Sequence, residues 1–266
     1  MHVKISIITA TRNMARFIEP CILSILQQCY PNFEHIVIDG ASTDNTCEIL
    51  GRYPHIRWVS EPDDGMSDAL NKGIRMSSGE IIGCCNADDL YLPGTLTTAN
   101  DYLQQHPDVD LLYGDYRMTD ETGRSLRVIR ETHFSPAVFR WIHVNIVPPP
   151  AAFWRRCIHD QGIWFDTKLR YAMDYDFLRR VCAKGYKFKH VNILFSDFRQ
   201  HGGSLTAEGG QLLEHEYIVR RDANDIWKKM GPAFPAFRLL FLLTVRIVRT
   251  AEKCIKGAYF DLFCRK

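Results

Sequence analysis

The chain has 266 residues, of which 46% are hydrophobic and 24% are charged, and its formal net charge is +2. This length allows one large domain or two small ones with a substantial core, and the composition excludes a disordered or fibrous protein. The near-neutral charge gives no reason to expect a nucleic-acid partner.

Cysteine usage and hydropathy narrow the class of protein further. The nine cysteines are dispersed and form no C-x-x-C pair, which indicates reduced thiols rather than a disulfide framework or a zinc site. The N-terminal apolar run is too short for a signal peptide. The longest apolar run, 239–245, is far shorter than the roughly 20 residues of a membrane-spanning helix. We therefore expect a cytoplasmic protein without transmembrane segments.

The first half of the chain alternates short β-branched segments with amphipathic ones. Strands are predicted at 4–9, 34–39, 56–60, 80–85 and 109–113. Helices are predicted between the first two strands, at 66–76, and from Pro93 to about Gln105. This alternation predicts an α/β fold in which a mostly parallel sheet carries helices on both faces.

The second half alternates less regularly. We expect a hairpin over 117–130, a helix over 174–184, two short strands at 188–191 and 194–198, and a long helix over 208–230.

Polar side chains follow each of the first four predicted strands. They occupy residues 9–13, 39–44, 61–64 and 86–89, and three of these segments carry paired or near-paired carboxylates. Ligands of such a sheet bind beyond the carboxyl ends of its strands. The acids are therefore expected to meet at one rim.

Two adjacent carboxylates, Asp88 and Asp89, follow the buried segment GEIIGCC. Neighbouring carboxylates raise each other's pKa, and a divalent cation relieves their repulsion. Oxygen ligands suit Mg²⁺ or Mn²⁺, which can complete their coordination with water and substrate phosphates. The alternative is that Asp89 caps the helix near Pro93.

Asp39 and Asp44 lie at the two ends of the segment DGASTD. Asp44 suits the first turn of a helix, where the helix dipole favours a carboxylate. Asp39 ends a hydrophobic strand and can accept a hydrogen bond from a nucleobase or a ribose hydroxyl. No Gly-x-Gly-x-x-Gly follows a strand, so a dinucleotide cofactor is not expected.

Asp68, Asn71 and Lys72 share one predicted helix face because they lie at positions i, i+3 and i+4. The ordinary interpretation is a solvated, salt-bridged face. At the rim of the sheet, Lys72 could instead offset phosphate charge.

Asp174 and Asp176 open the helix predicted over 174–184. Acids at this position usually interact with the helix dipole, but a carboxylate anchored at the edge of a cleft also suits a general base. Arg179, about one turn further on, could meet a diphosphate or pair with Asp176.

Taken in order, five segments resemble the motif set of family-2 glycosyltransferases with the GT-A fold: ISIITATRN, VIDGASTDNT, SEPDDGMSDALNKGI, SGEIIGCCNADDLYLPG and MDYDFLRRV. The resemblance covers roughly residues 3–205 and is greatest to bacterial enzymes that add single sugars to capsule, O-antigen or exopolysaccharide precursors. It implies a GT-A catalytic domain over 1–205, with a nucleotide-binding half (1–115) and an acceptor-side half (116–205).

The resemblance implies roles for individual residues. The candidates for nucleotide-sugar binding are Thr9, Thr11, Asn13, Asp39, Asp44, Asp68, Asn71, Lys72, Asn86, Ala87, Asp88, Arg179 and His201. Arg179 is included because it lies about one helical turn after Asp176, not because of the resemblance. The segment Asn86-Ala87-Asp88 takes the place of the Asp-x-Asp motif, although many members have an acid where Asn86 stands. Asp88, Asp89 and His201 are the candidate ligands of Mn²⁺ or Mg²⁺.

Asp174 matches the catalytic base of inverting members. Met173 stands where a Glu is common, so the choice between Asp174 and Asp176 is left open.

The expected reaction is metal-dependent, inverting transfer of one sugar from a nucleoside-diphosphate sugar to a saccharide hydroxyl. A UDP sugar is expected first, with GDP and dTDP sugars as alternatives. The Gln-x-x-Arg-Trp motif of processive synthases is absent. Two other functions compete: a non-catalytic sugar-nucleotide-binding module, and a sugar-nucleotide pyrophosphorylase. The latter would need a glycine-rich loop where TATRNMARF has no glycine.

The C-terminal segment 206–266 is predicted to be a helical, basic and amphipathic extension. From Lys228 onward it carries nine Lys or Arg and two acidic residues. Basic amphipathic helices bind anionic membrane surfaces, so we expect peripheral attachment at the inner face of the cell membrane, where a lipid-linked acceptor would lie. The alternative is a helix docked on the core.

Overall fold

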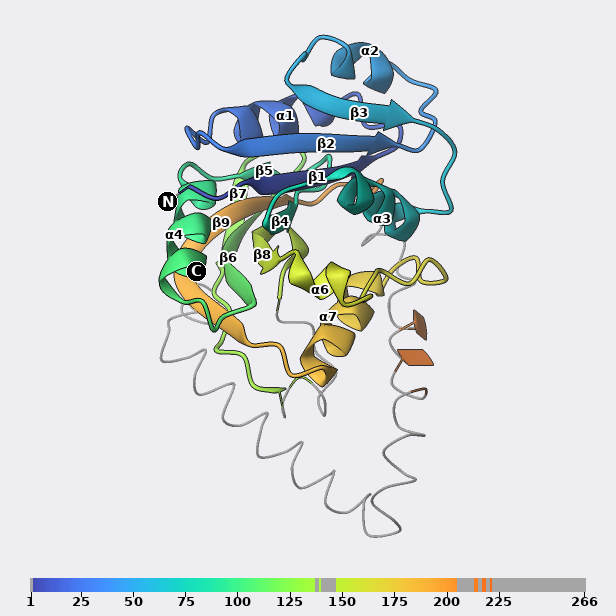
Figure 1. Ribbon diagram of the computed structural model, residues 1–266. Helices are drawn as coiled ribbons and strands as arrows, with labels where there is room; N and C mark the ends of the chain where they lie inside the picture. Colours follow the sequence, from blue (N-terminus) through green and yellow to red (C-terminus); the bar gives the residue numbers. More distant parts are fainter. Residues whose placement is uncertain are drawn as a thin grey trace, which may run out of the picture.

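The computed structural model describes residues 2–136, 139, 147–204, 213–214, 217–218 and 221. Its strands are β1 (Ile5–Thr11), β2 (Phe33–Asp39), β3 (Ile56–Ser60), β4 (Ile81–Cys84), β5 (Leu90–Tyr91), β6 (Leu111–Thr119), β7 (Ser125–Ile129), β8 (Ala152–Arg155) and β9 (Phe188–Arg199). They form one mixed sheet in the order β3-β2-β1-β4-β8-β6-β9-β5, and β7 pairs with β6 (Figure 1).

The expected α/β fold with a mostly parallel sheet is confirmed. Strands β3, β2, β1 and β4 run parallel to one another, as do β6 and β9. The antiparallel strand β8 lies between β4 and β6 and joins the two parallel groups. The carboxyl ends of β1, β2 and β3 lie in register, with Thr11 opposite Asp39 and Asp39 opposite Ser60.

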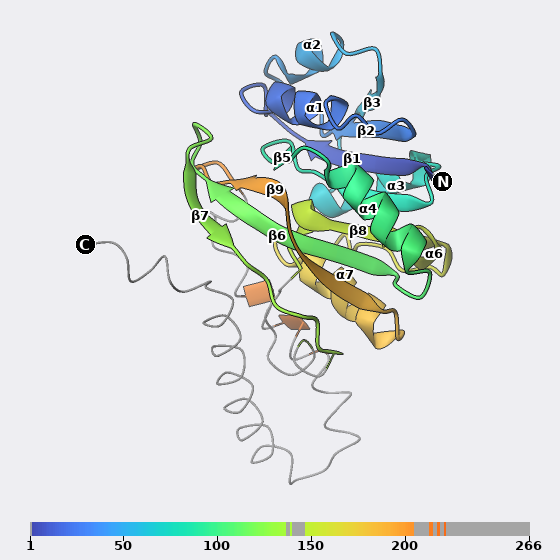
Figure 2. The same cartoon turned by 90° about the vertical axis from the view of Figure 1, so that its left-hand side faces the viewer.

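Helices cover both faces of the sheet (Figures 1 and 2). They are α1 (Ile18–Leu26), α2 (Thr46–Leu50), α3 (Met66–Met76), α4 (Thr95–Gln105), α6 (Cys157–Asp160) and α7 (Met173–Ala183), with a 3₁₀ turn, η1, at Pro149–Ala151.

The side chains of β1 pack alternately in two hydrophobic clusters, one on each face of the sheet. Ile5 and Ile7 pack in the hydrophobic cluster that includes residues of α1 and α4, whereas Ile8 packs in the cluster that includes residues of α3 and α7. Successive side chains of a strand point to opposite faces, so β1 contributes to both halves of the core. At Gly73 of α3, a Cβ atom would collide with the Ile8 side chain, so glycine permits the helix to approach the sheet closely.

Most predicted elements are present, and the differences have physical causes. Strand β9 is a single strand where two were expected, because its pairing with β6 continues through register shifts near Asp115. Strand β8 and helix α6 were not predicted, since both are only four residues long and too short to show a period. Helix α7 ends where expected, with Gly185 at φ 88° just beyond it.

The seven cysteines that lie in the described part of the chain are all free, as predicted. Within the same ranges, no helix is both long and apolar enough to cross a bilayer. The helix expected over 208–230 falls mostly outside the described residues, and its five described positions have helical backbone. The basic segment from Lys228 onward lies entirely outside them.

Candidate functional site

A cavity of about 1010 Å³ opens beyond the carboxyl ends of β1 and β4. Its walls come from the segment after β1, the start of α3, the segment after β4, the loop over 165–171 and the start of α7. Of the predicted site residues, those that line it are Thr11, Asn13, Asn86, Ala87, Asp88 and Asp174. The rule that ligands bind beyond parallel strand ends therefore located the cavity correctly.

Asp88 and His201 form the polar centre of the strand-end wall. The Asp88 Oδ2 atom lies 3.0 Å from His201 Nε2, and their side chains are 16% and 6% exposed. The pairing of β5 with β9 places Leu90 opposite Asp197, which brings the two segments together. The His201 ring also packs on Phe17, with ring centroids 4.5 Å apart, so Asp88 faces the cavity beside a held imidazole.

Asp89 lies behind Asp88 and is 1% exposed. Its Oδ1 accepts a hydrogen bond from the Arg199 backbone N–H (3.0 Å), and its Oδ2 accepts one from the Asn86 amide (2.8 Å). Burial, and then the nearby Asp88 charge, raises the pKa of Asp89 well above its ordinary value. Helix α4 has no side-chain cap, so the capping alternative for Asp89 is wrong.

A complete protein-only metal site is not present in the described ranges. No group of three or more His, Cys, Asp or Glu residues there is arranged to hold a metal ion. Asp88 and His201 supply an oxygen and a nitrogen donor at one point. Metal binding by Asp89 stays a prediction.

Thr11 is an unusual feature of the β1 end of the cavity. It is 5% exposed, it lines the cavity, and its Oγ1 has no hydrogen-bond partner among the residues that the structure describes. A buried hydroxyl without a partner is costly unless a ligand or water satisfies it. Thr9, by contrast, is fully buried, and its Oγ1 lies 2.9 Å from the His35 Nε2 atom on the neighbouring strand.

Asp39 lies just outside the cavity lining. Its side chain is fully buried, and its Oδ2 accepts hydrogen bonds from the Ser42 backbone N–H (2.9 Å) and the Ser60 hydroxyl (2.6 Å). It thus holds the ends of β2 and β3 together beside the loop that carries Asn13, whose backbone N–H donates to Ser42 Oγ (2.7 Å). Contact of Asp39 with a base stays a prediction.

Asp44 has the helix-start role that the sequence suggested. Its carboxylate accepts hydrogen bonds from the Thr46 backbone N–H at the start of α2 and from the Ala15 backbone N–H, both at 3.0 Å. Asp44 is exposed. Its slight burial tends to raise its pKa, but the hydrogen bonds outweigh this effect, so the pKa of Asp44 is lowered. Asp44 therefore joins α2 to the segment after β1.

On α3, Asp68 and Lys72 pair with each other at 3.2 Å, and Lys72 also pairs with Glu61 at 2.9 Å. The hydrogen bond to Glu61 is the main cause of the raised pKa of Lys72. Asn71 is buried, and its side-chain amide makes two hydrogen bonds to the Phe165 backbone, at 2.9 and 3.0 Å. None of these three predicted residues lines the cavity. Asn71 supports the cavity loop at Phe165, whereas Asp68 and Lys72 support the segment after β3.

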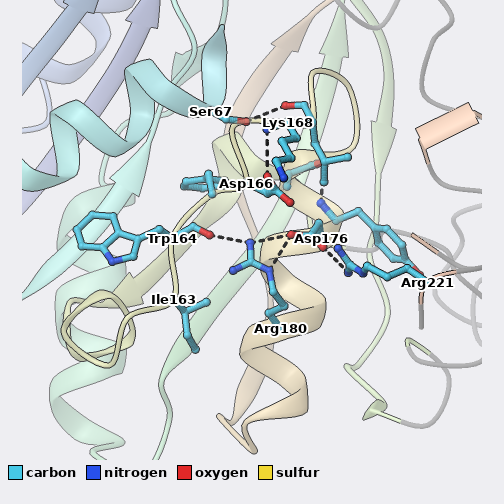
Figure 3. A network of polar contacts seen from close by, with 12 residues as sticks. Ser67, Ile163, Trp164, Asp166, Lys168, Asp176, Arg180 and Arg221 are labelled. Carbon is cyan, nitrogen blue, oxygen red and sulfur yellow. Dashed lines mark hydrogen bonds and ion pairs between the residues drawn. The ribbon is translucent and has the colours of Figure 1, made fainter. Parts of the chain in front are cut away.

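Asp174 and Asp176 have different surroundings although both lie in the first turn of α7. Asp174 is partly exposed and lines the cavity. Asp176 is fully buried and pairs with Arg180 at 2.7 Å and with Arg221 at 2.6 Å. Figure 3 shows Arg180 between Asp176 and the Trp164 carbonyl, to which it donates at 2.6 Å. Asp174 is thus the acid with access to a substrate.

Arg179 is not at the cavity. It is 8% exposed, and its Nη1 donates to the Tyr175 hydroxyl at 3.0 Å. The expected contact with a diphosphate stays a prediction.

Several cavity residues were not among the predicted ones, namely Tyr116, Glu131, Trp154, Phe165, Lys168, Arg170 and Tyr171. Arg12, Asp63 and Asp64 also line the cavity; they belong to the strand-end segments 9–13 and 61–64 that were expected at this rim, although no individual role was assigned to them. Lys168, Arg170 and Tyr171 directly precede the helix that carries Asp174, which is a weaker signal. Trp154 lies on β8, which has no clear sequence pattern.

Comparison with solved structures identifies the fold. The chain superimposes on Staphylococcus aureus TarS 1–349, solved in complex with UDP, with a TM-score of 0.66 and 20% identity over 90% of this chain and 69% of that one. It also superimposes on the mannosyltransferase PcManGT of Pyrobaculum calidifontis, solved with GDP-Man and Mn²⁺, with a TM-score of 0.60 and 20% identity over 100% of this chain and 89% of that one. The protein has the GT-A fold of nucleotide-sugar glycosyltransferases.

The sequence comparisons give the family. Residues 6–162 match glycosyl transferase family 2, and the chain belongs to that family. It is 31% identical to an uncharacterised glycosyltransferase of Rickettsia conorii over 68% of this chain, and it spans 31% of the length of that protein. It is 27% identical to a PGL/p-HBAD biosynthesis glycosyltransferase of Mycobacterium tuberculosis over 81% of this chain and 82% of the relative.

Proposed function

We propose that this protein transfers a single sugar from a nucleoside-diphosphate sugar to a hydroxyl group of a saccharide acceptor, with inversion at the anomeric carbon. One observation carries the proposal: Asp88, paired with His201, lines the same cavity as Asp174. A group that can hold a cation and a group that can accept a proton thus face one space large enough for a nucleotide sugar.

The residues around Asp88 fit a divalent cation. A carboxylate oxygen and an imidazole nitrogen lie 3.0 Å apart, and Mn²⁺ accepts both types of donor. Asp88 and His201 would hold the ion, and Asp89 would fix the segment through its bonds to Asn86 and Arg199. When bound, the cation would stabilise the charge that develops on the leaving diphosphate. The Mn²⁺ bound to the mannosyltransferase neighbour supports this choice.

The nucleotide would bind at the ends of β1 and β2. The Thr11 hydroxyl is buried without a partner in the described part of the chain and would gain one from the donor. Asp39, at the end of β2, is the residue that we expect to accept a hydrogen bond from the base or the ribose. The UDP and GDP-Man of the two structural neighbours support a nucleotide-sugar donor; we expect UDP first, with GDP and dTDP as alternatives.

Asp174 would act as the general base. It would accept the proton of the acceptor hydroxyl while the oxygen attacks the anomeric carbon on the face opposite the diphosphate, which inverts the configuration. A positioned base typically contributes about 10²–10⁴-fold to rate. Asp176 does not suit this role because two arginines neutralise it in a buried position.

A donor screen tests the proposed function directly. UDP, GDP and dTDP sugars would be assayed with Mn²⁺ for hydrolysis and for thermal stabilisation of the full chain. We expect one nucleotide class to be hydrolysed slowly and to raise Tm, with both effects lost in EDTA. Stabilisation without hydrolysis or transfer to any acceptor would favour a non-catalytic binding module. In a separate assay with a nucleoside triphosphate and a sugar 1-phosphate, formation of a nucleotide sugar with release of pyrophosphate would favour a pyrophosphorylase.

We further propose that the acceptor is a lipid-linked saccharide used in cell-surface polysaccharide synthesis, met at the inner face of the membrane. The support is the basic amphipathic sequence after Lys228 and the mycobacterial relative named for PGL/p-HBAD biosynthesis. Co-sedimentation with anionic and neutral liposomes tests the location. A full-length variant with Arg246, Arg249 and Lys253 changed to Glu should lose binding to anionic liposomes; equal binding by both proteins would contradict the proposal.

A further inference from the structure

We propose that Glu214 is a positioning residue that sets the backbone leading into Asp174. The proposal rests on the proposed function, since it takes Asp174 to be the base. Glu214 lies 40 positions after Asp174 in the sequence and belongs to none of the motifs that indicated the site.

The Glu214 carboxylate binds three consecutive backbone N–H groups. Its Oε1 accepts from Arg170 (2.8 Å), and its Oε2 accepts from Tyr171 (2.7 Å) and Ala172 (2.8 Å). Arg170 and Tyr171 line the cavity. Both carboxylate oxygens are thus committed to the segment that forms the cavity wall next to Asp174.

The Glu214 contact reaches the start of α7 at one residue. The first N–H groups of a helix have no partner within it, and Glu214 accepts a hydrogen bond from the N–H of Ala172, the residue at the cap position. A carboxylate there also interacts favourably with the helix dipole. The other two hydrogen bonds hold the residues before the helix, so Glu214 sets the direction of the backbone that leads into Asp174.

Two further contacts hold the segment that carries Glu214 in place. Ile218 is fully buried in the core cluster that includes α7 residues. Arg221 pairs with Asp176 at 2.6 Å, and Figure 3 shows this ion pair. The spacing of Glu214, Ile218 and Arg221 places them on one helix face. The exposed neighbours Leu213 and Tyr217 (75% and 56%) point away.

The other end of the cavity loop is anchored separately. The Asn71 amide holds Phe165, and the Ser67 hydroxyl donates to the Leu169 carbonyl at 2.9 Å. Residues 165–169 are thus fixed to α3, whereas 170–172 are fixed to Glu214. Removal of the Glu214 carboxylate should release the last three residues before the helix without releasing the rest of the loop.

The test compares Glu214→Ala with wild type in the sugar-transfer reaction. A misplacement near 1 Å can lower the rate about 10²-fold, so we expect transfer kcat to fall by about 10- to 100-fold while the donor KM and UDP affinity stay within about twofold. Leu213→Ala is the matched control and should match wild type. Glu214→Gln keeps one acceptor oxygen and should give an intermediate kcat.

Acetate provides a readout that a merely structural role would not give. The space left in Glu214→Ala can take a small carboxylate, so acetate at constant ionic strength should restore part of kcat in a saturable way, and should not change wild type or Leu213→Ala. Hydrogen exchange of the peptide over 169–174 should be faster in Glu214→Ala whether or not an acceptor is known.

Three results would overturn the proposal. These are an unchanged kcat in Glu214→Ala, unchanged hydrogen exchange over 169–174, and a parallel loss of UDP affinity, Tm and kcat that acetate does not reverse. Failure of the proposed function is distinguishable, because wild type itself would then transfer no sugar.

Discussion

Asp88 and His201 lie 3.0 Å apart although 113 positions separate them in the chain. Neither residue is a site by itself, because a lone acid after a strand usually caps a helix or fills a turn. Their contact gives an oxygen and a nitrogen donor at the cavity wall that Asp88 forms, and this contact makes a cation the expected ligand.

Asp88→Ala should lower sugar transfer by at least about 10³-fold, because electrostatic stabilisation of a leaving group is usually the largest catalytic contribution. The residual rate should no longer respond to Mn²⁺ or EDTA, and Mn²⁺ titration with UDP present should show weakened metal binding. Asp108→Ala, which changes a carboxylate that is 63% exposed, is the control and should behave as wild type. A metal-dependent rate near the wild-type value in Asp88→Ala would rule out Asp88 as a ligand.

Asp174→Ala should lower kcat by about 10²–10⁴-fold while nucleotide binding and Tm stay close to wild type. Asp176→Asn should show the opposite pattern, because it leaves Arg180 and Arg221 without their buried carboxylate and should cost about 3 kcal/mol of unfolding free energy. Calorimetry and single-turnover kinetics on both variants separate the roles. A normal rate in Asp174→Ala would require another base.

Secondary-structure elements meet at the cavity through their ends. The segment after β1, the start of α2 and the end of β2 are joined by Asp39, Ser42 and Asp44, and this connection explains how a five-residue helix keeps its place. In the same way, α3 and the C-terminal segment hold the loop before α7. Asp39, Ser42 and Asp44 therefore hold the elements beside the cavity in place.

Asp44→Ala should lower the free energy of unfolding by about 1 kcal/mol, the usual cost of removing a helix cap. The reason is loss of the bonds to Thr46 and Ala15. Asn45→Ala is a matched control, because the structure gives the neighbouring Asn45 no capping hydrogen bond. Denaturant unfolding of the two variants measures the difference; equal stabilities would contradict the capping role.

The molecule as a whole has buried histidines that make its stability depend on pH. The His159 Nε2 accepts from the Trp154 indole N–H at 2.8 Å, and its Nδ1 lies 2.8 Å from the Ile163 carbonyl, an arrangement that fits the neutral ring. Burial lowers the pKa of His159 from 6.5 to about 4 and that of His35 from 6.5 to about 3. Both rings are therefore neutral in the folded protein at physiological pH.

This arrangement predicts loss of stability in acid. Below pH 6.5 the unfolded chain takes up a proton on His159, whereas the folded protein does not until about pH 4. The contribution of the neutral His159 ring to the free energy of unfolding is thus fully present above pH 6.5. It is lost as pH falls toward 4, at about 1.4 kcal/mol per pH unit. His159→Gln should reduce the slope of unfolding free energy against pH by that amount, and His2→Gln, at an exposed position, should not. An unchanged slope in His159→Gln would contradict the assignment.

Local pattern was sufficient for the central elements of the fold. Alternation of β-branched strands with amphipathic helices predicted β1 to β4, α1, α3, α4 and α7, because a repeated period over several turns reports which face is buried. The rule for parallel sheets then placed Thr11, Asn13 and Asp88 at one rim. Strand β8, with four residues between loops, offered no period to detect.

The sequence by itself determined the class of fold, the rim of the sheet where ligands bind, and the acids that could act there. Tertiary structure decided the roles. The β5–β9 pairing brings His201 to Asp88, the arginines at 180 and 221 withdraw Asp176 from the cavity, and Glu214 reaches the segment before Asp174. These contacts join residues far apart in the chain, and long-range pairing depends on how the elements pack rather than on the local preferences that a sequence pattern records.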